Sequence, residues 1–345
     1  MRIEEHVALA PYTTFKIGGS ADYFCNVRTK RDLEDALAFC RKKSIPFSIV
    51  GGGSNLLISD SGFRGLVIKI ELRGRLSRDI DTNFVEVSVA AGENWDTFVE
   101  EAVLRGVYGI ENLSGIPGSV GGTPIQNVGA YGAEVADVIV SVTACNAETG
   151  TWHRFAADEC KFDYRTSYFK TLVGRKYIIS EVTFRLQKQG RLNTSYKDLT
   201  NYFIEHKELP TLLSVRRAVL EIRSRKFPDL QTYGTAGSFF KNPIVSASVA
   251  ARVCKLFPNI PLFPVSKNKT KIPAAWLIEH VGGFKGSTSR NVGSFQNQAL
   301  VVVNYGDAKA DDVMEFGNNI INDIYAKTGI QLEREVQLVG VFDVQ

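Results

Sequence analysis

The segment AGSFFKNP, residues 236–243, presents one hydroxyl group, that of Ser238, between a glycine and two phenylalanines. Lys241 and Asn242 follow at once. This mixture is typical of a pocket wall, because a surface turn does not need the phenylalanines and a core strand would exclude the lysine. None of the four histidines forms a recognisable triad with Ser238, and the G-x-S-x-G motif is missing. We therefore favour a hydroxyl group that gives up a proton over a serine that only caps a turn.

Two further stretches carry charges that could act on an anionic ligand. In CKFDYRTSYFK, residues 160–170, the planar guanidinium of Arg165 lies among aromatic residues and could bind both oxygens of a carboxylate or phosphate. In QLEREVQLVG, residues 331–340, Glu333 and Glu335 share one face of an expected strand. The ordinary alternatives are a surface ion pair or cation–π contact for Arg165, and a paired charge at the rim of a sheet for Glu335.

Two glycine-rich stretches could bind a phosphorylated ligand. VGGGSNLLISD, residues 50–60, can bring several backbone N–H groups close to a pyrophosphate, although it has neither the G-x-G-x-x-G fingerprint nor a P-loop. LSGIPGSVGGTPIQNVGAYG, residues 113–132, is long and irregular, and two prolines stiffen it. Together they favour one extended dinucleotide. A plain turn is the alternative for the first stretch, and a flexible linker for the second.

These residues must be positioned by a mixture of helices and strands. The clearest helical stripes are Leu33, Ala36 and Leu37 in the first predicted helix, for which Thr29 is the expected N-cap, and the apolar face of the last helix. The predicted helices span residues 29–43, 94–106, 214–227, 245–258, 274–283 and 310–329. The predicted strands span residues 46–50, 65–72, 83–92, 135–150, 176–187, 297–304 and 331–342.

The composition is that of an ordinary globular protein, with 345 residues, 44% of them hydrophobic and 23% charged. The net charge is +4 and the basic residues are scattered, so we expect no nucleic-acid partner. The five cysteines have no C-x-x-C spacing, so neither a disulfide framework nor a zinc site is predicted, and reduced thiols fit a cytoplasmic protein. The chain starts without a signal-peptide pattern and has no stretch near the ~20 apolar residues of a membrane helix, so we expect no membrane insertion.

Taken together and in this order, GGGSN, IPGSVGG, QNVGAYG, YRTS, AGSFFKNP and KIPAAWLIE resemble the UDP-N-acetylenolpyruvoylglucosamine reductase family over essentially the whole chain. The stretch around Tyr196 is similar to the substrate-covering loop of the longer form of that family. The resemblance implies an α+β chain: a peptide-oxygenase-like (vanillyl-alcohol-oxidase-like) FAD-binding fold in two subdomains, and a C-terminal α/β substrate-binding domain. These parts would span residues 1–71 together with 332–345, residues 72–225, and residues 226–331.

The resemblance also implies a reaction. FAD would be the cofactor and NADPH the co-substrate, and UDP-N-acetylglucosamine enolpyruvate would be reduced to UDP-N-acetylmuramate for peptidoglycan synthesis by a monomer. Arg165, Ser238 and Glu335 would be the catalytic residues. The residues at FAD would be Gly51, Gly52, Gly53, Ser54, Asn55, Ser114, Gly115, Ile116, Pro117, Gly118, Ser119, Gly121, Gly122 and Arg223. The residues at the substrate would be Tyr131, Tyr196, Lys226, Asn242 and Gln298.

Two competing interpretations stay open at this point. A flavin-dependent alcohol oxidase could use the same FAD fold, but no flavin-linking histidine or cysteine motif is evident near the glycine loops, and Ser238 would go unexplained. A non-catalytic flavin- or sugar-nucleotide-binding protein would bind its ligand without turnover.

Overall fold

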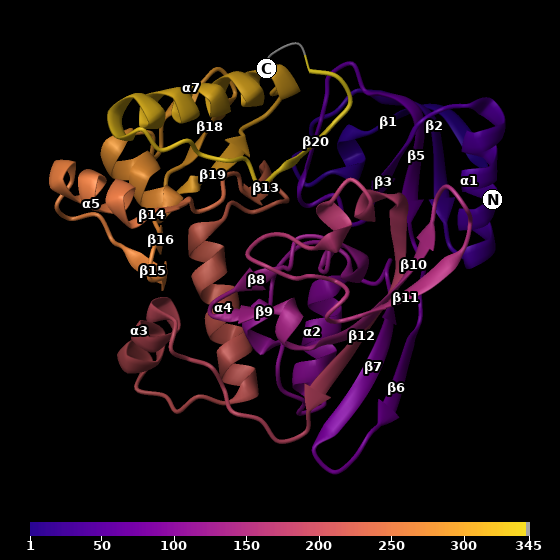
Figure 1. The fold of residues 1–345 in the computed structure, drawn as a ribbon, viewed down its shortest axis with the longest axis horizontal. Helices are drawn as coiled ribbons and strands as arrows, with labels where there is room; N and C mark the ends of the chain where they lie inside the picture. Colours follow the sequence, from indigo (N-terminus) through magenta and orange to yellow (C-terminus); the bar gives the residue numbers. More distant parts are fainter. Residues whose placement is uncertain (343–345) are drawn as a thin grey trace. The chain divides into compact units, whose positions relative to one another are not determined.

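The structure, a computed structural model, describes residues 1–342 (Figure 1). The chain divides into two compact units, each assembled from segments that are far apart in the sequence. The first unit consists of Met1–Val7, Ala21–Gly52 and Arg64–Ser224. The second consists of Ala8–Ser20, Gly53–Phe63 and the described part of the chain from Arg225 onward. The division into three functional parts stays a prediction.

The first unit contains a four-stranded sheet that is covered by helix α1 (Lys30–Lys43). The predicted cap is confirmed, because the Thr29 side chain accepts a hydrogen bond from the backbone of Asp32, whose carboxylate accepts one from the backbone of Thr29. The apolar stripe of α1 is buried in the core shared with this sheet. In spatial order the strands are β1 (Ile3–Ala8), β2 (Ser20–Val27), β5 (Phe63–Ile70) and β3 (Phe47–Val50).

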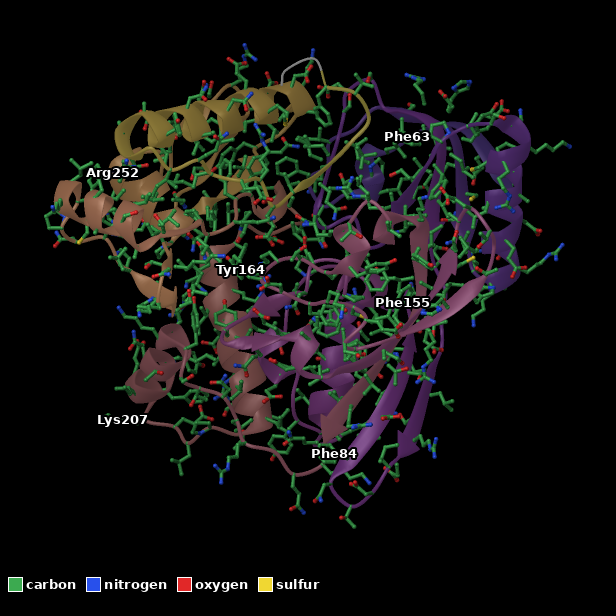
Figure 2. All side chains as sticks on the ribbon, in the orientation of Figure 1. Phe63, Phe84, Phe155, Tyr164, Lys207 and Arg252 are labelled. Atoms are coloured by element: carbon green, nitrogen blue, oxygen red, sulfur yellow. The ribbon has the colours of Figure 1, made fainter. Side chains whose placement is uncertain are left out.

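A second, antiparallel sheet of the first unit packs against α2 (Trp95–Leu104). The rings of Trp95 and Phe98 lie 5.8 and 5.2 Å from the ring of Phe184, so helix and sheet are joined by aromatic contacts. On the same sheet Phe155, labelled in Figure 2, packs against further aromatic rings. In spatial order the strands are β11 (Trp152–Ala156), β10 (Ile139–Asn146), β12 (Tyr177–Gln187), β7 (Phe84–Ala90) and β6 (Arg75–Asp79).

Shorter elements complete the first unit. A hairpin is formed by β8 (Gly129–Ala130) and β9 (Ala133–Glu134), and two helices follow near the end of the unit, α3 (Lys197–His206) and α4 (Leu212–Lys226). Short 3-10 turns occur at Glu111–Leu113, Val120–Gly122, Val135–Asp137, Tyr168–Lys170 and Gly174–Lys176.

The second unit has its own core around α7 (Ala310–Thr328). The predicted apolar face of this helix is confirmed, because Val313, Phe316, Ile320 and Ile324 are all buried. The sheet strands are β13 (Gly234–Ser238), β19 (Gln298–Asn304), β18 (Val292–Phe295) and β17 (Thr288–Ser289), and a smaller sheet holds β14 (Ile244–Ser246), β16 (Lys269–Lys271) and β15 (Phe263–Ser266). The remaining elements are the turn Ala10–Tyr12, β4 (Leu56–Ile58) paired in parallel with β20 (Gln337–Val339), α5 (Ala247–Leu256) and α6 (Ala274–Trp276).

Two predicted elements of the second unit differ from the structure. The closing strand is regular only over Gln337–Val339, and before it a single bridge joins Arg334 to Phe240. The prediction over 331–342 was too long, because this segment takes its hydrogen bonds from several different partners. The predicted helix over 274–283 continues after α6 as a π-helix, Leu277–Val281.

All five cysteines are free thiols. Within residues 1–342 there is no group of three or more His, Cys, Asp or Glu side chains that could hold a metal ion. No helix in that range is long and apolar enough to cross a bilayer.

Candidate active site

Ser238 is the last residue of β13 and follows a distortion of that strand. Thr235 is opposite Val303 of β19, whereas Ser238 is opposite Val301, so the register shifts between them. Gly237 has a φ of 75°, which a side chain would strain, although a Cβ there would meet no atom within 4 Å. The strand ends directly after this irregularity, at Ser238, which is half-buried. The backbone therefore sets the direction in which the Cα–Cβ bond of Ser238 leaves the strand.

The two phenylalanines that follow Ser238 are core residues. Phe239 and Phe240 are each 1% exposed, and their rings meet edge to face at 5.0 Å. They anchor the end of β13 in the core of the second unit. The sequence predicted them as part of a pocket wall, and the structure shows that they also anchor the strand in the core.

Glu335 is held beside this anchor by backbone hydrogen bonds. Its N–H donates to the backbone oxygen of Phe239 at 2.8 Å. Asn55 forms two hydrogen bonds with the same segment. Its side-chain Nδ2 donates to the backbone oxygen of Glu335 at 3.2 Å, and its backbone oxygen accepts from the N–H of Gln337 at 3.0 Å. Ser238 and Glu335 therefore lie on neighbouring backbone segments of one unit. Glu335 is only 9% exposed.

Glu333 and Glu335 do not share one environment, although the alternation of a strand predicted it. The side chain of Glu333 is 71% exposed and forms an ion pair with Lys241. The difference arises because the chain at this point is not a regular strand. Glu333 is the rim charge, and Glu335 is the buried carboxyl group.

Arg165 belongs to the first unit and lies beside the β8–β9 hairpin. Its Nη2 donates to the backbone oxygen of Gly129 at 2.8 Å, and its guanidinium lies 5.8 Å from the ring of Tyr164, which Figure 2 labels. Tyr168 and Phe169 pack instead on Phe155. The aromatic neighbours in the sequence thus anchor the loop more than they contact the arginine. That Arg165 acts together with Ser238 and Glu335 stays a prediction.

Tyr131, Tyr196 and Arg223 lie close together in the first unit. The rings of Tyr131 and Tyr196 meet edge to face at 5.5 Å. Burial raises the pKa of Tyr131 to about 12, against the opposing effect of the Arg223 charge. Burial also lowers the pKa of Arg223, which the nearby Tyr131 and Asp96 partly offset. Arg223 Nε donates to the backbone oxygen of Gly115 at 3.0 Å, so it joins the second glycine loop to Tyr131.

The two glycine loops meet within the first unit. A Cβ on Gly52 would collide with the backbone of Gly118, and one on Gly51 would collide with the hydroxyl of Ser119. Beside this contact is a cavity of about 160 Å³. It is lined by Gly51, Gly52, Lys69, Ile70, Glu71, Arg73, Gly92, Asn94, Gly118 and Ser119.

Several other residues of the predicted FAD set have structural roles of their own. A Cβ on Gly53 would collide with the backbone of Tyr12, and its φ is 66°, so glycine is required there. The Ser114 hydroxyl donates to the backbone oxygen of Glu111 at 2.6 Å. Gly121 packs against Ala91. Contact with a cofactor stays a prediction for the whole set, in which Ser54, Ile116, Pro117 and Gly122 complete the two loops.

The remaining predicted substrate residues lie in the second unit. Asn242 accepts a hydrogen bond through Oδ1 from the backbone of Ala274 at 2.9 Å, which turns its amide nitrogen the opposite way. Gln298 begins β19, the strand that pairs with the end of β13 at Ser238. Lys226 is the last residue of α4.

The comparisons with known proteins agree with one another. Residues 21–156 match the FAD binding domain family, and residues 229–339 match the C-terminal domain of UDP-N-acetylenolpyruvoylglucosamine reductase. The reductases of that name from Flavobacterium johnsoniae and Pseudomonas aeruginosa are each 39% identical to this chain over 98% of its length, and the matches cover 100% and 99% of those proteins. The chain belongs to the UDP-N-acetylenolpyruvoylglucosamine reductase family.

A solved structure of the family supports the same assignment. The UDP-N-acetylenolpyruvylglucosamine reductase from Thermus caldophilus matches with a TM-score of 0.68 at 26% identity, over 99% of this chain and 100% of that one. The predicted α+β fold, with an FAD-binding domain followed by a separate C-terminal domain, is thereby confirmed.

The family assignment directs attention to residues that the sequence analysis missed. Lys69 donates through Nζ to the backbone oxygen of Gly51, and burial lowers its pKa. Arg73 lines the same cavity. A lysine within the apolar strand GLVIKIEL was the available signal. These cations beside the two glycine loops fit the negative charge of a dinucleotide diphosphate.

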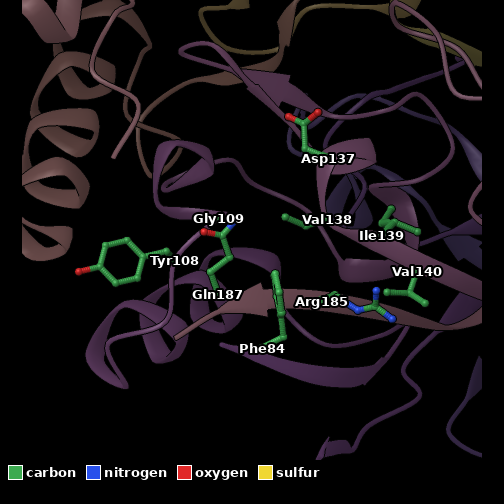
Figure 3. A pocket seen from close by; sticks show the side chains of 9 residues that line it. All are labelled: Phe84, Tyr108, Gly109, Asp137, Val138, Ile139, Val140, Arg185 and Gln187. Atoms are coloured by element: carbon green, nitrogen blue, oxygen red, sulfur yellow. The ribbon is translucent and has the colours of Figure 1, made fainter. Parts of the chain in front are cut away.

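A second pocket of the first unit, about 200 Å³ in volume, contains none of the predicted site residues (Figure 3). Its arginine, Arg185, pairs with Glu86 at 2.7 Å. The lining is Phe84, Tyr108, Gly109, Asp137, Val138, Ile139, Val140, Arg185 and Gln187.

Proposed function

We propose that this chain reduces the enolpyruvyl group of UDP-N-acetylglucosamine enolpyruvate to give UDP-N-acetylmuramate for peptidoglycan synthesis, with FAD as cofactor and NADPH as electron source. Membership of the reductase family carries the proposal. The single structural observation that supports it best is the buried Glu335 hydrogen-bonded through its backbone next to Ser238. We further propose a monomer in the cytoplasm, where the five free thiols stay reduced.

The residues present fit FAD. The two glycine loops approach each other so closely that no side chain fits at Gly51 or Gly52, and Lys69 and Arg73 in the adjoining cavity would balance the charge of a diphosphate. Arg223, which donates to the carbonyl of Gly115, would hold the second loop in place for the cofactor. When bound, FAD supplies a hydride, received from NADPH, to C3 of the enolpyruvyl group.

Arg165 and Glu335 would stabilise the negative charge that spreads onto the substrate carboxylate as an enolate forms. A guanidinium can bind both carboxylate oxygens, and its hydrogen bond to Gly129 limits the directions it can take. Glu335, protonated or sharing a proton, would donate a hydrogen bond to the same charge. Its backbone hydrogen bonds to Phe239 and Asn55 fix its position beforehand.

Ser238 would donate the proton to C2 of the substrate. A serine is a poor acid, so it acts only on the strongly basic enolate that lies against it. The half-buried position of Ser238 and the packed Phe239–Phe240 pair beside it would limit the access of competing water. The substrate would be bound by Tyr131, Tyr196, Lys226, Asn242 and Gln298.

An anaerobic experiment on the purified protein tests the proposal. We expect an oxidised flavin spectrum near ~450 nm, bleaching by NADPH, and rapid return of the colour when UDP-N-acetylglucosamine enolpyruvate is added. Recovery with oxygen but not with the enolpyruvyl substrate would contradict the reductase activity in favour of an oxidase. A protein that binds no FAD would contradict the flavoenzyme proposal as a whole.

A further inference from the structure

Asn112 connects two segments that the proposed function places at the substrate. It lies in the turn Glu111–Leu113 and is 2% exposed. Its Nδ2 donates to the backbone oxygens of Tyr131 and of Asn193, each at 2.8 Å. Two carbonyl acceptors use both hydrogens of this NH2 group, so the orientation of the amide is fixed.

The first segment that Asn112 holds is a strained turn. Tyr131 and Gly132 connect β8 to β9, and both have positive φ, 50° and 82°. A positive φ is unfavourable for a bulky residue such as tyrosine, so the surroundings must impose it. The oxygen of Tyr131 is held by Asn112, and that of Gly132 accepts from the side chain of Asn193 at 2.9 Å.

The second segment carries Tyr196. The Oδ1 of Asn193 accepts hydrogen bonds from the N–H and hydroxyl of Ser195, at 3.2 and 2.7 Å. The hydroxyl of Thr200 donates to the oxygens of residues 194 and 196. These bonds order the chain from 193 to the start of α3, and they place the half-exposed Tyr196 ring against the ring of Tyr131. Asn112 is the buried group through which both segments are joined.

A purely structural asparagine would have both ends of its amide satisfied. The Oδ1 atom of Asn112 is buried and accepts no hydrogen bond from any described residue. The side chain thus leaves its oxygen buried without a hydrogen bond, at a cost in free energy, while its nitrogen holds two carbonyl groups together. This pattern is better explained by a need to place Tyr131 and Tyr196 than by stability alone.

We propose that Asn112 is a positioning residue that pre-assembles the Tyr131–Tyr196 pair for substrate binding. The inference rests on the proposed function for the part played by the two tyrosines. The connection between the two segments does not depend on the proposed function, because Asn112 joins them through hydrogen bonds within the chain.

Asn112→Asp is the sharpest test, because it replaces the donor with an oxygen of the same size that faces two carbonyl oxygens. We expect KM for the enolpyruvyl substrate to rise about 10-fold, with kcat and the rate of flavin reduction by NADPH within about twofold of the wild type. Backbone amides of residues 193–200 should exchange hydrogen at least about 10-fold faster. Unchanged KM together with unchanged exchange would overturn the proposal.

A double variant separates positioning from general damage. If Asn112 acts through Tyr196, then Asn112→Asp added to Tyr196→Ala should raise KM little beyond Tyr196→Ala alone. If the increases in KM caused by the two substitutions instead multiplied in the double variant, the proposal would be overturned. Should Asn112→Asp fold poorly, Asn193→Ala removes the bond to Gly132 without burying a charge, and we expect the same changes at about threefold.

The matched control is Asn304→Asp in the second unit. Asn304 is 5% exposed, and its Nδ2 donates to the oxygen of Phe15 at 3.1 Å. It should lower stability without faster exchange at residues 193–200. If the wild type proved inactive on the substrate, the exchange measurement would still decide whether Asn112 holds the loop, so failure of the proposed function and of this inference are distinguishable.

Discussion

The neighbourhood of Ser238 and Glu335 and the neighbourhood of Tyr131 and Arg223 are built in different ways. In the first, the backbone sets the positions, through the bond from Glu335 N–H to Phe239 and the register shift in β13. In the second, side chains set them, through Asn112 and Arg223. Side-chain substitution should therefore change the chemistry of the first region and leave its shape, whereas in the second it should change the shape.

The largest effect is expected where the backbone admits no side chain at all. In Gly52→Ala the new Cβ would collide with the backbone of Gly118, and neither partner is a flexible side-chain end. We expect FAD affinity to fall by at least about 10³-fold, measured by titrating the apoprotein and following flavin fluorescence. The matched control is Gly122→Ala, where a Cβ would meet only the hydroxyl oxygen of Ser119, at an ordinary contact distance of 4.0 Å. Equal FAD affinity in both variants would contradict the contact between the loops.

Glu335→Gln tests the backbone-positioned region next. The variant keeps the backbone hydrogen bonds to Phe239 and Asn55 and changes only the acidity of the side chain. We expect a drop of about 10²–10³ in the rate of flavin reoxidation by substrate, with thermal stability unchanged. A large loss of stability with normal turnover would show that Glu335 is a structural charge.

Asp96→Asn tests the side-chain-positioned region. Asp96 accepts from Arg216 at 2.6 and 3.0 Å and from Gly115 N–H at 2.5 Å, so it ties α4 to the second glycine loop. Arg216 is buried, and Glu100 at 3.4 Å would be its one remaining partner among the described residues. Loss of the nearer charge should lower the free energy of unfolding by about 2–3 kcal/mol, measured by urea denaturation at pH 7. A change in the free energy of unfolding below about 0.5 kcal/mol would mean that the Asp96–Arg216 pair does not stabilise the fold.

The same pair predicts a pH dependence. Burial alone would raise the pKa of Asp96, but the hydrogen bonds from Arg216 and Gly115 outweigh it and hold the pKa below its usual value. A carboxylate with a lowered pKa stabilises the fold above its unfolded pKa of about 3.9, and this contribution is lost as pH falls through the folded value. The stability gap between the wild type and Asp96→Asn should thus be full at pH 7 and narrow below about pH 4. A gap that stays constant down to pH 2 would contradict this origin.

The smallest effect is expected at Glu333, the neighbour of Glu335 in the alternating pattern. Its side chain is 71% exposed and pairs with Lys241 at the surface. Surface ion pairs contribute about 0–1 kcal/mol, so Glu333→Gln should change turnover less than about twofold. Steady-state kinetics of Glu333→Gln and Glu335→Gln, measured side by side, would show this difference in turnover. Similar losses of turnover in the two variants would contradict it.

Periodic segments could be predicted from the sequence because their signal is local. The stripe and cap of α1, the apolar face of α7 and the alternation of β7 depend on residues a few positions apart. The predicted strand over 331–342 was too long because the N–H groups of Glu335 and Gln337 donate to the backbone oxygens of Phe239 and Asn55, which are remote in the sequence.

Candidate catalytic residues could be proposed from sequence motifs, and their part in catalysis stays a prediction; the residues that support the site could not be found in that way. Ser238, Arg165 and Glu335 stand in recognisable motifs, whereas Asp96, Lys69 and Asn112 act through partners that only the fold brings near. Asp96 lies in the first turn of α2, which Asn94 caps, but the ion-pair partner of Asp96 lies on α4. No local pattern marks such a pair.

The role of Ser238 is tested most directly by measuring the two half-reactions of Ser238→Ala separately by anaerobic stopped flow. If Ser238 is the proton donor, NADPH should reduce the flavin at nearly the wild-type rate, whereas reoxidation by UDP-N-acetylglucosamine enolpyruvate should slow by about 10²–10⁴-fold, the contribution of a positioned proton donor. Equal loss in both half-reactions, or normal reoxidation without the hydroxyl group, would contradict the role of Ser238 as the acid.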